Sequence, residues 1–258
     1  MNDQRESIPP QGNFLSVNDI ELYYEVYGEG PPLLILHGFT HSGQFWQPFV
    51  EALSQHHQLI IPDLPGHGRS TNPTNQFLHR QVALDLFALL DHLQIDQFQA
   101  VGLSAGGMTL LHMATQQPAR VARMILIGTA SYLPEQSRAI YRARTRESDD
   151  WNWSMLRTHH RYGEEQIWAI MDQFHGFKDS YEDMNFTGPY LSTISAKTLI
   201  VHGDRDPLFP ISIAIEMYNA IPNAYLWIIP NELHVPFQGQ RRQSFVQIVL
   251  EFLGGAWE

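Results

Sequence analysis

The chain has 258 residues, which is enough for one sizeable buried core, so a single domain with room for an insertion is the default expectation. Its 27 acidic residues against 16 Lys and Arg give a formal charge of −11, which disfavours nucleic acid and anionic membrane surfaces as partners. The sequence contains no cysteine, and this excludes a thiol nucleophile, disulfides and cysteine-bound zinc. No cation-flanked apolar stretch opens the chain and no apolar run reaches bilayer-spanning length, so we expect a cytoplasmic protein with no signal peptide and no membrane insertion.

Short apolar runs alternate with segments of helical period along most of the chain. Residues 14–17 and 20–27 are separated only by an Asn18-Asp19 turn, which predicts an antiparallel hairpin. Near-continuous apolar runs follow, typical of strands covered on both faces, at residues 33–36, 58–61, 98–103, 123–127, 198–201 and 225–229. Apolar residues at helical spacing predict helices at residues 44–54, 80–93, 105–117, 212–220 and 241–253. This alternation predicts an α/β fold with a mostly parallel central sheet, an N-terminal antiparallel hairpin and helices on both faces.

One interval breaks the alternation. About seventy residues separate the strand that ends near residue 127 from the strand at residue 198, far more than an ordinary strand-to-helix connection. We expect a helical lid inserted at residues 130–194, with residues 1–129 and 195–258 forming the core. A charged run at residues 142–150 is interpreted as a solvated helix face rather than as an anion site. Later apolar side chains of the insertion are candidates for substrate contact: Trp151, Trp153, Met155, Trp168, Met171, Phe174 and Met184.

The strongest chemical motif lies at residues 102–107, which read Gly-Leu-Ser-Ala-Gly-Gly between an apolar strand and a helical segment. A serine on a tight strand-to-helix turn needs small neighbours, and such a turn projects the hydroxyl above the sheet at a helix N-terminus. An ordinary glycine-rich turn gives the same pattern. Ser104 is therefore a candidate nucleophile that requires a base and an orienting acid within reach.

The base and the acid are expected in loops that follow the later strands. Among 13 histidines, His234 is the best placed, because it lies in the loop between the last apolar strand and the final helix. Asp206 follows the strand at residues 198–201, at the edge of the sheet where catalytic loops gather in open α/β folds. Asp204 competes for this role, but we expect it to cap the local turn. The other histidines, including the pairs at residues 56–57 and 159–160, are interpreted as surface or packing residues, since their spacing fits no zinc motif.

With these motifs in place, the sequence resembles the α/β-hydrolase superfamily, and within it serine carboxylesterases and the enol-lactone hydrolase and haloperoxidase-like members. The resemblance rests on the segments at residues 36–39 and 63–70, on the elbow at Ser104 and on the loops at Asp206 and His234. These motifs occur in the family's order, and the resemblance covers nearly the whole chain. It implies an α/β-hydrolase fold with an inserted lid.

The resemblance also implies roles for individual residues. Ser104 matches the nucleophile, His234 the general base and Asp206 the acid that orients the base. The backbone N–H groups of Phe39 and Ala105 match the oxyanion hole. His37 and the segment at residues 63–70 are expected to hold loops rather than to transfer protons.

The expected activity is hydrolysis of carboxylic esters of small to medium apolar substrates through an acyl-enzyme. The expected partner is a small-molecule ester, bound by a monomer or a homodimer, and no cofactor and no metal are expected. One alternative is a hydrolase of lactones or carbon–carbon bonds that uses the same three side chains. Another is a ligand receptor that retains the hydrolase fold. Fold alone does not choose among these reactions.

Overall fold

The computed structural model of the chain describes residues 12–257. Most of the N-terminal segment for which we predict no signal peptide therefore lies outside the described residues. No helix in the described part is long and apolar enough to cross a membrane.

Within residues 12–257 the strands form one eight-stranded sheet in the order β1-β2-β4-β3-β5-β6-β7-β8. Their bounds are Asn13–Val17 (β1), Ile20–Tyr27 (β2), Pro32–Leu36 (β3), Gln58–Pro62 (β4), Phe98–Leu103 (β5), Val121–Ile127 (β6), Lys197–Gly203 (β7) and Ala224–Ile229 (β8). β1 and β2 form an antiparallel hairpin, β2 runs antiparallel to β4, and all later pairs are parallel. The predicted fold class is confirmed.

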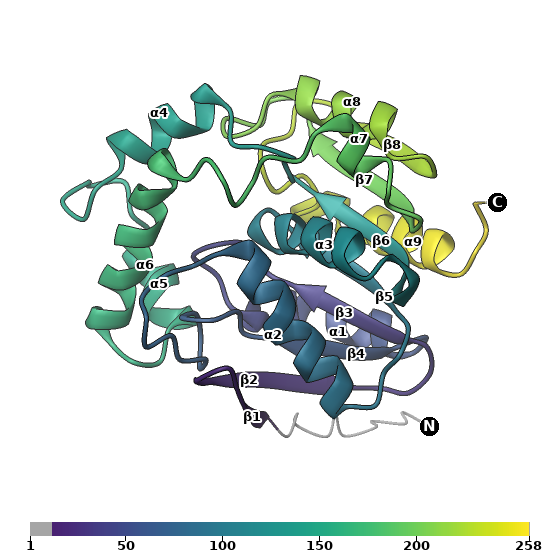
Figure 1. Ribbon diagram of the computed structural model, residues 1–258, viewed down its shortest axis with the longest axis horizontal. Coiled ribbons are helices and arrows are strands. Elements are labelled where there is room, and N and C mark those ends of the chain that lie inside the picture. Colours follow the sequence, from purple (N-terminus) through teal and green to yellow (C-terminus); the bar gives the residue numbers. More distant parts are fainter. Residues whose placement is uncertain (1–11, 258) are drawn as a thin grey trace.

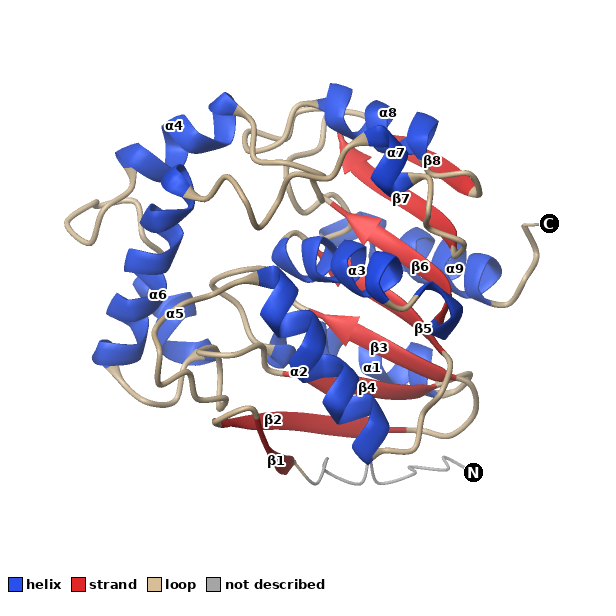
Figure 2. Ribbon diagram, in the orientation of Figure 1, coloured by secondary structure: helices blue, strands red, loops and turns tan. Residues whose placement is uncertain are grey.

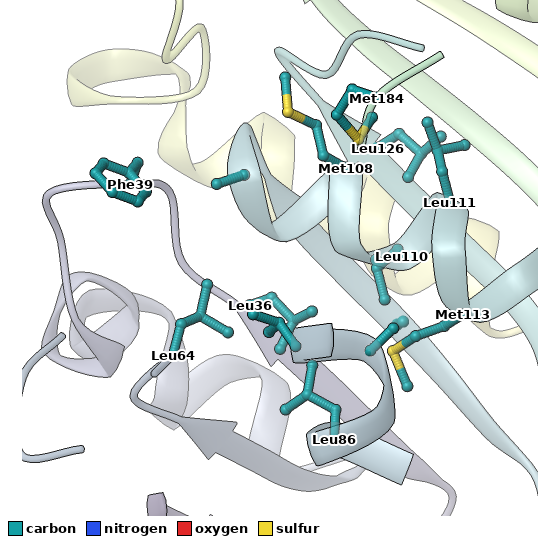
Figure 3. Packing of buried hydrophobic residues seen from close by; sticks show 14 of the residues in the cluster. Leu36, Phe39, Leu64, Leu86, Met108, Leu110, Leu111, Met113, Leu126 and Met184 are labelled. Carbon is teal, nitrogen blue, oxygen red and sulfur yellow. The ribbon is translucent and has the colours of Figure 1, made fainter. Parts of the chain in front are cut away.

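Both faces of the sheet are covered by helices, as the continuous apolar runs predict. Side chains of β3 alternate between two cores: Leu34 and Leu36 join the first, whereas Leu33 and Ile35 join the second. Helices on the first face are α2 (His79–His92), α3 (Ala105–Gln116) and α8 (Ile211–Ala220) (Figure 1). The second face is covered by α1 (Gln47–Ser54) and α9 (Arg242–Leu253). Figure 3 shows part of the first core, where side chains of β3, α2 and α3 meet.

One predicted helix is divided in the structure. Instead of one helix over residues 44–54, a 3₁₀ turn at Gly43–Trp46 precedes α1. Pro48 lies at the second position of α1, where a residue without a backbone N–H is tolerated because the first-turn amides have no partner within the helix. The proline thus fixes where the α-helix begins.

The segment between β6 and β7 is helical. It contains α4 (Glu135–Ala143), α5 (Trp153–His159), α6 (Glu164–Gly176) and α7 (Gly188–Leu191). In Figure 2, α4, α5 and α6 stand beyond the carboxyl ends of the parallel strands, at the edge that the arrowheads face. The last of the four, α7, packs back against α3 and α8 of the core. This placement puts α4, α5 and α6 above the sheet edge where the predicted functional loops emerge.

Candidate active site

Ser104 occupies a strained turn between β5 and α3. Its backbone has φ 52° and ψ −114°, a left-handed conformation that non-glycine residues rarely adopt. The Ser104 N–H donates to the Ile127 carbonyl at 2.8 Å, and the Ser104 carbonyl accepts from the Met108 N–H at 2.9 Å. These two bonds attach the turn to β6 and to the first turn of α3. Such strain persists only where the surrounding structure fixes it, and it clusters at functional sites.

The glycines of the motif are explained by crowding around this turn. A Cβ on Gly102 would lie 2.6 Å from the backbone of Gly106 and Gly107. A Cβ on Gly106 would lie 2.7 Å from the Leu36 carbonyl oxygen, because β3 and β5 pair in register at Leu36 and Gly102. The elbow therefore excludes any side chain at either position.

His234 and Asp206 form a hydrogen-bonded pair. The ring nitrogen Nδ1 of His234 donates to Asp206 Oδ2 at 2.7 Å. The Asp206 side chain is fully buried, whereas the His234 side chain keeps 18% of its surface exposed. Since Nδ1 carries the proton in this bond, Nε2 remains the basic nitrogen of the neutral imidazole. Within the described residues Ser104 and His234 make no direct hydrogen bond, although both line one cavity; such bonds often tighten only when substrate is present.

The environment of Asp206 favours its charged form. Burial raises the pKa of this carboxyl, but the hydrogen bond and electrostatic attraction of His234, together with two backbone amides, outweigh burial and lower the pKa. The amides are those of Leu208 and Phe209, which donate to Oδ1 at 2.8 and 3.2 Å. Asp204 is placed differently, since its carboxylate accepts from the Asn231 N–H at 2.5 Å and so braces the loop after β8.

The loop after β3 lies beside the elbow. The Leu64 N–H donates to His37 Nε2 at 2.9 Å, and His37 Nδ1 donates to the Gly38 carbonyl at 2.8 Å. Burial lowers the pKa of His37 well below its usual range, so this ring is neutral and holds two loops together. Phe39 and Ala105 line the same cavity as Ser104. Ala105 opens α3, where backbone N–H groups have no partner within the helix.

A cavity of about 220 Å³ lies between the elbow and the inserted helices. Of the seven predicted substrate contacts, Trp151, Met155 and Phe174 line it. The other four do not contribute to its wall: Met171 and Met184 are buried elsewhere in the core, Trp153 is half-buried with the Arg157 guanidinium over its ring, and Trp168 keeps 38% of its surface exposed. The aromatic content of the insertion predicts a covered apolar site, but it does not identify which rings face the cavity.

Sequence reasoning missed several cavity residues. Tyr141 and Phe177 line the cavity and are not among the predicted contacts. Within α6 the helical period separates Phe174 from Trp168, because Ile170 and Phe174 share one buried helical face and Trp168 lies off it. Burial, with a further contribution from the Asp206 charge, raises the pKa of Tyr141, so its hydroxyl stays protonated.

Known proteins resemble this chain in sequence and in fold. Residues 31–152 match the family model of the α/β hydrolase fold, a stretch that contains the loop after β3 and the elbow. Solved structures agree over nearly the whole chain. A meta-cleavage product hydrolase from Pseudomonas fluorescens covers 95% of this chain and 98% of its own, with a TM-score of 0.77 and 22% identity. This chain has the α/β-hydrolase fold.

Curated relatives match most of this chain's length. The serine hydrolase BPHL of Mus musculus is 28% identical over 253 residues, which cover 93% of this chain and 85% of that protein. A pimeloyl-[acyl-carrier protein] methyl ester esterase of Vibrio vulnificus is 26% identical over 270 residues, covering 91% and 98%. The proteins similar to this chain thus include a methyl ester esterase by sequence and a meta-cleavage product hydrolase by fold. Among the described residues of this chain, no three His, Asp or Glu side chains are grouped so that they could hold a metal ion.

Proposed function

We propose that the hydrolase cleaves uncharged carboxylic esters of small to medium size through an acyl-enzyme on Ser104. The observation that carries the proposal is that a strained elbow serine and an imidazole held by a buried carboxylate line one apolar cavity. The names of two relatives, a serine hydrolase and a methyl ester esterase, support the same chemistry.

The proposed reaction uses each group once in each half. Ser104 Oγ attacks the ester carbonyl carbon while His234 Nε2 takes the serine proton, and the alcohol then leaves with that proton. The same imidazole then takes a proton from water as the water oxygen attacks the acyl carbon; the bond between that carbon and Ser104 Oγ breaks, Oγ receives the proton from His234 Nε2, and the acid leaves. Asp206 stabilises the imidazolium that forms in each half. The N–H groups of Phe39 and Ala105 would bind the oxyanion, with each such donor contributing about 3 to 4 kcal/mol in known enzymes.

Cavity size and lid charge favour small uncharged substrates. The cavity, at about 220 Å³, lies below the roughly 300 Å³ at which pockets for drug-sized ligands begin. Four of the six arginines of the insertion pair with acids, as Arg142–Glu135, Arg144–Asp150, Arg146–Asp172 and Arg157–Glu164. Their charge is therefore neutralised locally rather than presented to an anionic substrate. We propose residues 130–194 as the lid that sets this selectivity.

The test is the Ser104→Ala variant, assayed with p-nitrophenyl esters from acetyl to dodecanoyl. We expect kcat to fall by about 10⁴-fold or more with the fold retained by circular dichroism. In the wild-type enzyme we expect the highest kcat/KM with a short or medium acyl chain. Near-normal turnover by Ser104→Ala would refute the proposal.

The same three side chains serve the alternatives, so substrate comparison separates them. Esters, enol-lactones and vinylogous diketones are compared at one enzyme concentration. We expect esters to give the highest kcat/KM. A higher value with a lactone or a diketone would assign the hydrolase to that reaction, and single-turnover behaviour with every compound would favour a receptor.

A further inference from the structure

Two adjacent histidines of the inserted segment form hydrogen bonds with loops of the core. His159 ends α5, and the Ser42 N–H donates to His159 Nδ1 at 3.1 Å. His160 follows, with 4% of its surface exposed, and reaches the backbone of two core loops. The sequence offers no sign of these contacts, since they join residues 92 to 120 positions apart.

His160 uses both ring nitrogens. The Gly68 N–H donates to His160 Nδ1 at 3.1 Å, so this nitrogen carries no proton. The Thr40 carbonyl can only accept, so His160 Nε2 carries the proton and donates to it at 3.1 Å. The contacts fix a single neutral tautomer in which both polar atoms of the ring are satisfied.

The turn at residues 38–41 carries the proposed oxyanion donor, the Phe39 N–H. Thr40 has φ 69°, an unfavourable left-handed conformation that needs support from outside the turn. Within the turn, the His41 N–H donates to the Gly38 carbonyl at 3.2 Å. The ring of Phe39 packs edge-on against Phe177 of the insertion, with centroids 4.9 Å apart. His160 adds the bond that anchors Thr40 itself.

The second partner of His160 lies on a loop already joined to this turn. Asp63 Oδ1 accepts from the Gly43 N–H at 2.7 Å, and Oδ2 accepts from the Arg69 N–H at 2.8 Å. Asp63 therefore ties the two loops together on the core side. His160 ties the same two loops through Thr40 and Gly68 from the side of the insertion.

We propose that His160 is a positioning residue for ester hydrolysis: from the inserted lid, it holds Thr40 and so fixes the Phe39 N–H where the oxyanion forms. This inference rests on the proposed function, because it assigns the Phe39 N–H to the oxyanion hole. The lid thereby contributes to assembly of the catalytic geometry as well as to the wall of the cavity.

The groups that face His160 keep it neutral. Burial, together with the neighbouring His67, His159 and His41, lowers the pKa of His160 to about 3. His159 in turn faces His41 and Arg161, and burial lowers its pKa to about 4. Proton uptake by His160 would place an N–H against the Gly68 N–H, so only the neutral ring makes both bonds.

The test compares three substitutions at residue 160. His160→Gln keeps an acceptor and a donor of similar reach, His160→Asn is one methylene shorter, and His160→Phe keeps a ring without polar atoms. We expect His160→Phe to lower kcat by about 10- to 100-fold, because small misplacements of catalytic groups have such effects, with KM changed less than about threefold. His160→Gln should restore most of kcat, and His160→Asn should lie between. If His160→Phe does not fold, the Gln and Asn variants carry the comparison.

A transition-state analogue supplies a readout that a merely structural role would not move. An alkyl trifluoromethyl ketone accepts Ser104 Oγ at its carbonyl carbon and leaves an oxyanion, with the serine proton on His234. Its inhibition constant should rise by the same factor by which kcat/KM falls in each variant. His92→Phe, at an exposed position at the end of α2, is the matched control and should change neither.

Three results would overturn the inference: kcat unaffected by all substitutions, equal losses for Gln and Phe, or lower kcat with unchanged inhibitor affinity. The concentration of active sites is measured with a serine-directed phosphonate, so that kcat refers to folded enzyme. Loss of activity in Ser104→Ala together with unchanged His160 variants refutes only the role of His160. Full activity in Ser104→Ala refutes the proposed function itself.

Discussion

Two aspartates lie two positions apart after β7, and their hydrogen bonds separate their roles. Asp206 accepts from His234 Nδ1, whereas Asp204 accepts from a backbone amide of the loop after β8. Asp206→Asn should lower kcat by about 10⁴-fold, because an amide favours the wrong imidazole tautomer and cannot stabilise the imidazolium. Asp204→Asn should lower it less than about tenfold. Steady-state kinetics of both purified variants decide the matter, and equal losses would show that the acid is misassigned.

The three proposed catalytic residues could be predicted from the sequence, because one lies in a local motif and the other two follow strands in a known order along the chain. Ser104 stands in a motif whose glycines have steric reasons, and Asp206 and His234 follow strands that end at one edge of the sheet. The role of His160 depends on Thr40 and Gly68, which are distant in the sequence and present only backbone atoms. No residue pattern encodes such a contact, so the pair at residues 159–160 is indistinguishable from surface or packing histidines until the fold is known.

The elbow between β5 and α3 depends on glycines, which have no side chain to collide with the neighbouring backbone. Gly106→Ala would place a Cβ 2.7 Å from the Leu36 carbonyl oxygen and push α3 away from β3. We expect a loss of roughly 1–3 kcal/mol in the free energy of unfolding and a fall in kcat of at least about tenfold.

Gly176→Ala is the matched control for the elbow variant. A Cβ at Gly176 would meet no atom within 4 Å, and this residue has an ordinary helical backbone. Alanine should therefore raise the free energy of unfolding by up to about 1 kcal/mol and leave kcat unchanged. Urea unfolding and kinetics of the two variants are compared. A stable, fully active Gly106→Ala variant would refute the steric explanation of the motif.

The inserted helices provide a second comparison between residues of one type. Trp151 lines the cavity, with its ring edge-on to Phe174 and its indole N–H donating to the Thr145 carbonyl at 2.7 Å. Trp168 is partly exposed, with the Arg146 guanidinium over its ring. Trp151→Ala enlarges the cavity, so the preferred acyl chain should become longer, with about a fourfold change in relative kcat/KM for each methylene accommodated.

Trp168→Ala should leave the acyl-chain profile unchanged, because its ring lies outside the cavity. Both variants are assayed with the same series of p-nitrophenyl esters. Identical profiles for wild type and Trp151→Ala would mean that the insertion does not set chain-length selectivity.

The elements themselves differed in how far they could be predicted. Buried parallel strands are short and continuously apolar, so their positions were clear, and β5 coincides with the predicted residues 98–103. The insertion was predicted from the length of the interval, its aromatic content and the family resemblance, none of which assigns a position to a single side chain. Some aromatic rings of the inserted helices pack against one another and others line the cavity. Both positions favour the same apolar and aromatic residue types. This is why Trp151 and Trp168 looked equivalent in the sequence.

For the whole molecule, buried histidines set the response of stability to acid. Burial lowers the pKa of His67 to about 4 and that of His160 to about 3. Histidine in the unfolded chain has a pKa of about 6.5. Below that pH the unfolded chain binds protons that the folded protein does not bind, so the free energy of unfolding falls as the pH falls. Burial raises the pKa of Asp63 to about 6, which acts in the opposite direction between about pH 6 and pH 4.

Two buried histidines outweigh one buried aspartate, so acid should destabilise the fold. A histidine with a folded pKa of 4 alone corresponds to about 3 kcal/mol between pH 6.5 and pH 4. Urea unfolding at about pH 7 and about pH 4.5 should show a lower midpoint at the acid value, and His67→Phe should reduce that difference. A midpoint independent of pH across this window would contradict the neutral, buried state of these rings.

In the proposed mechanism the acyl group of the ester is transferred to Ser104 Oγ and then to water. The most direct measurement is mass spectrometry of the protein quenched in acid within one turnover of a p-nitrophenyl ester, followed by peptide mapping. We expect the mass of the wild-type protein to increase by the mass of the acyl group, with the adduct on Ser104, and we expect no such adduct in the Ser104→Ala variant. Acyl transfer to another residue, or turnover by wild type and Ser104→Ala alike with no adduct in either, would contradict the proposed mechanism.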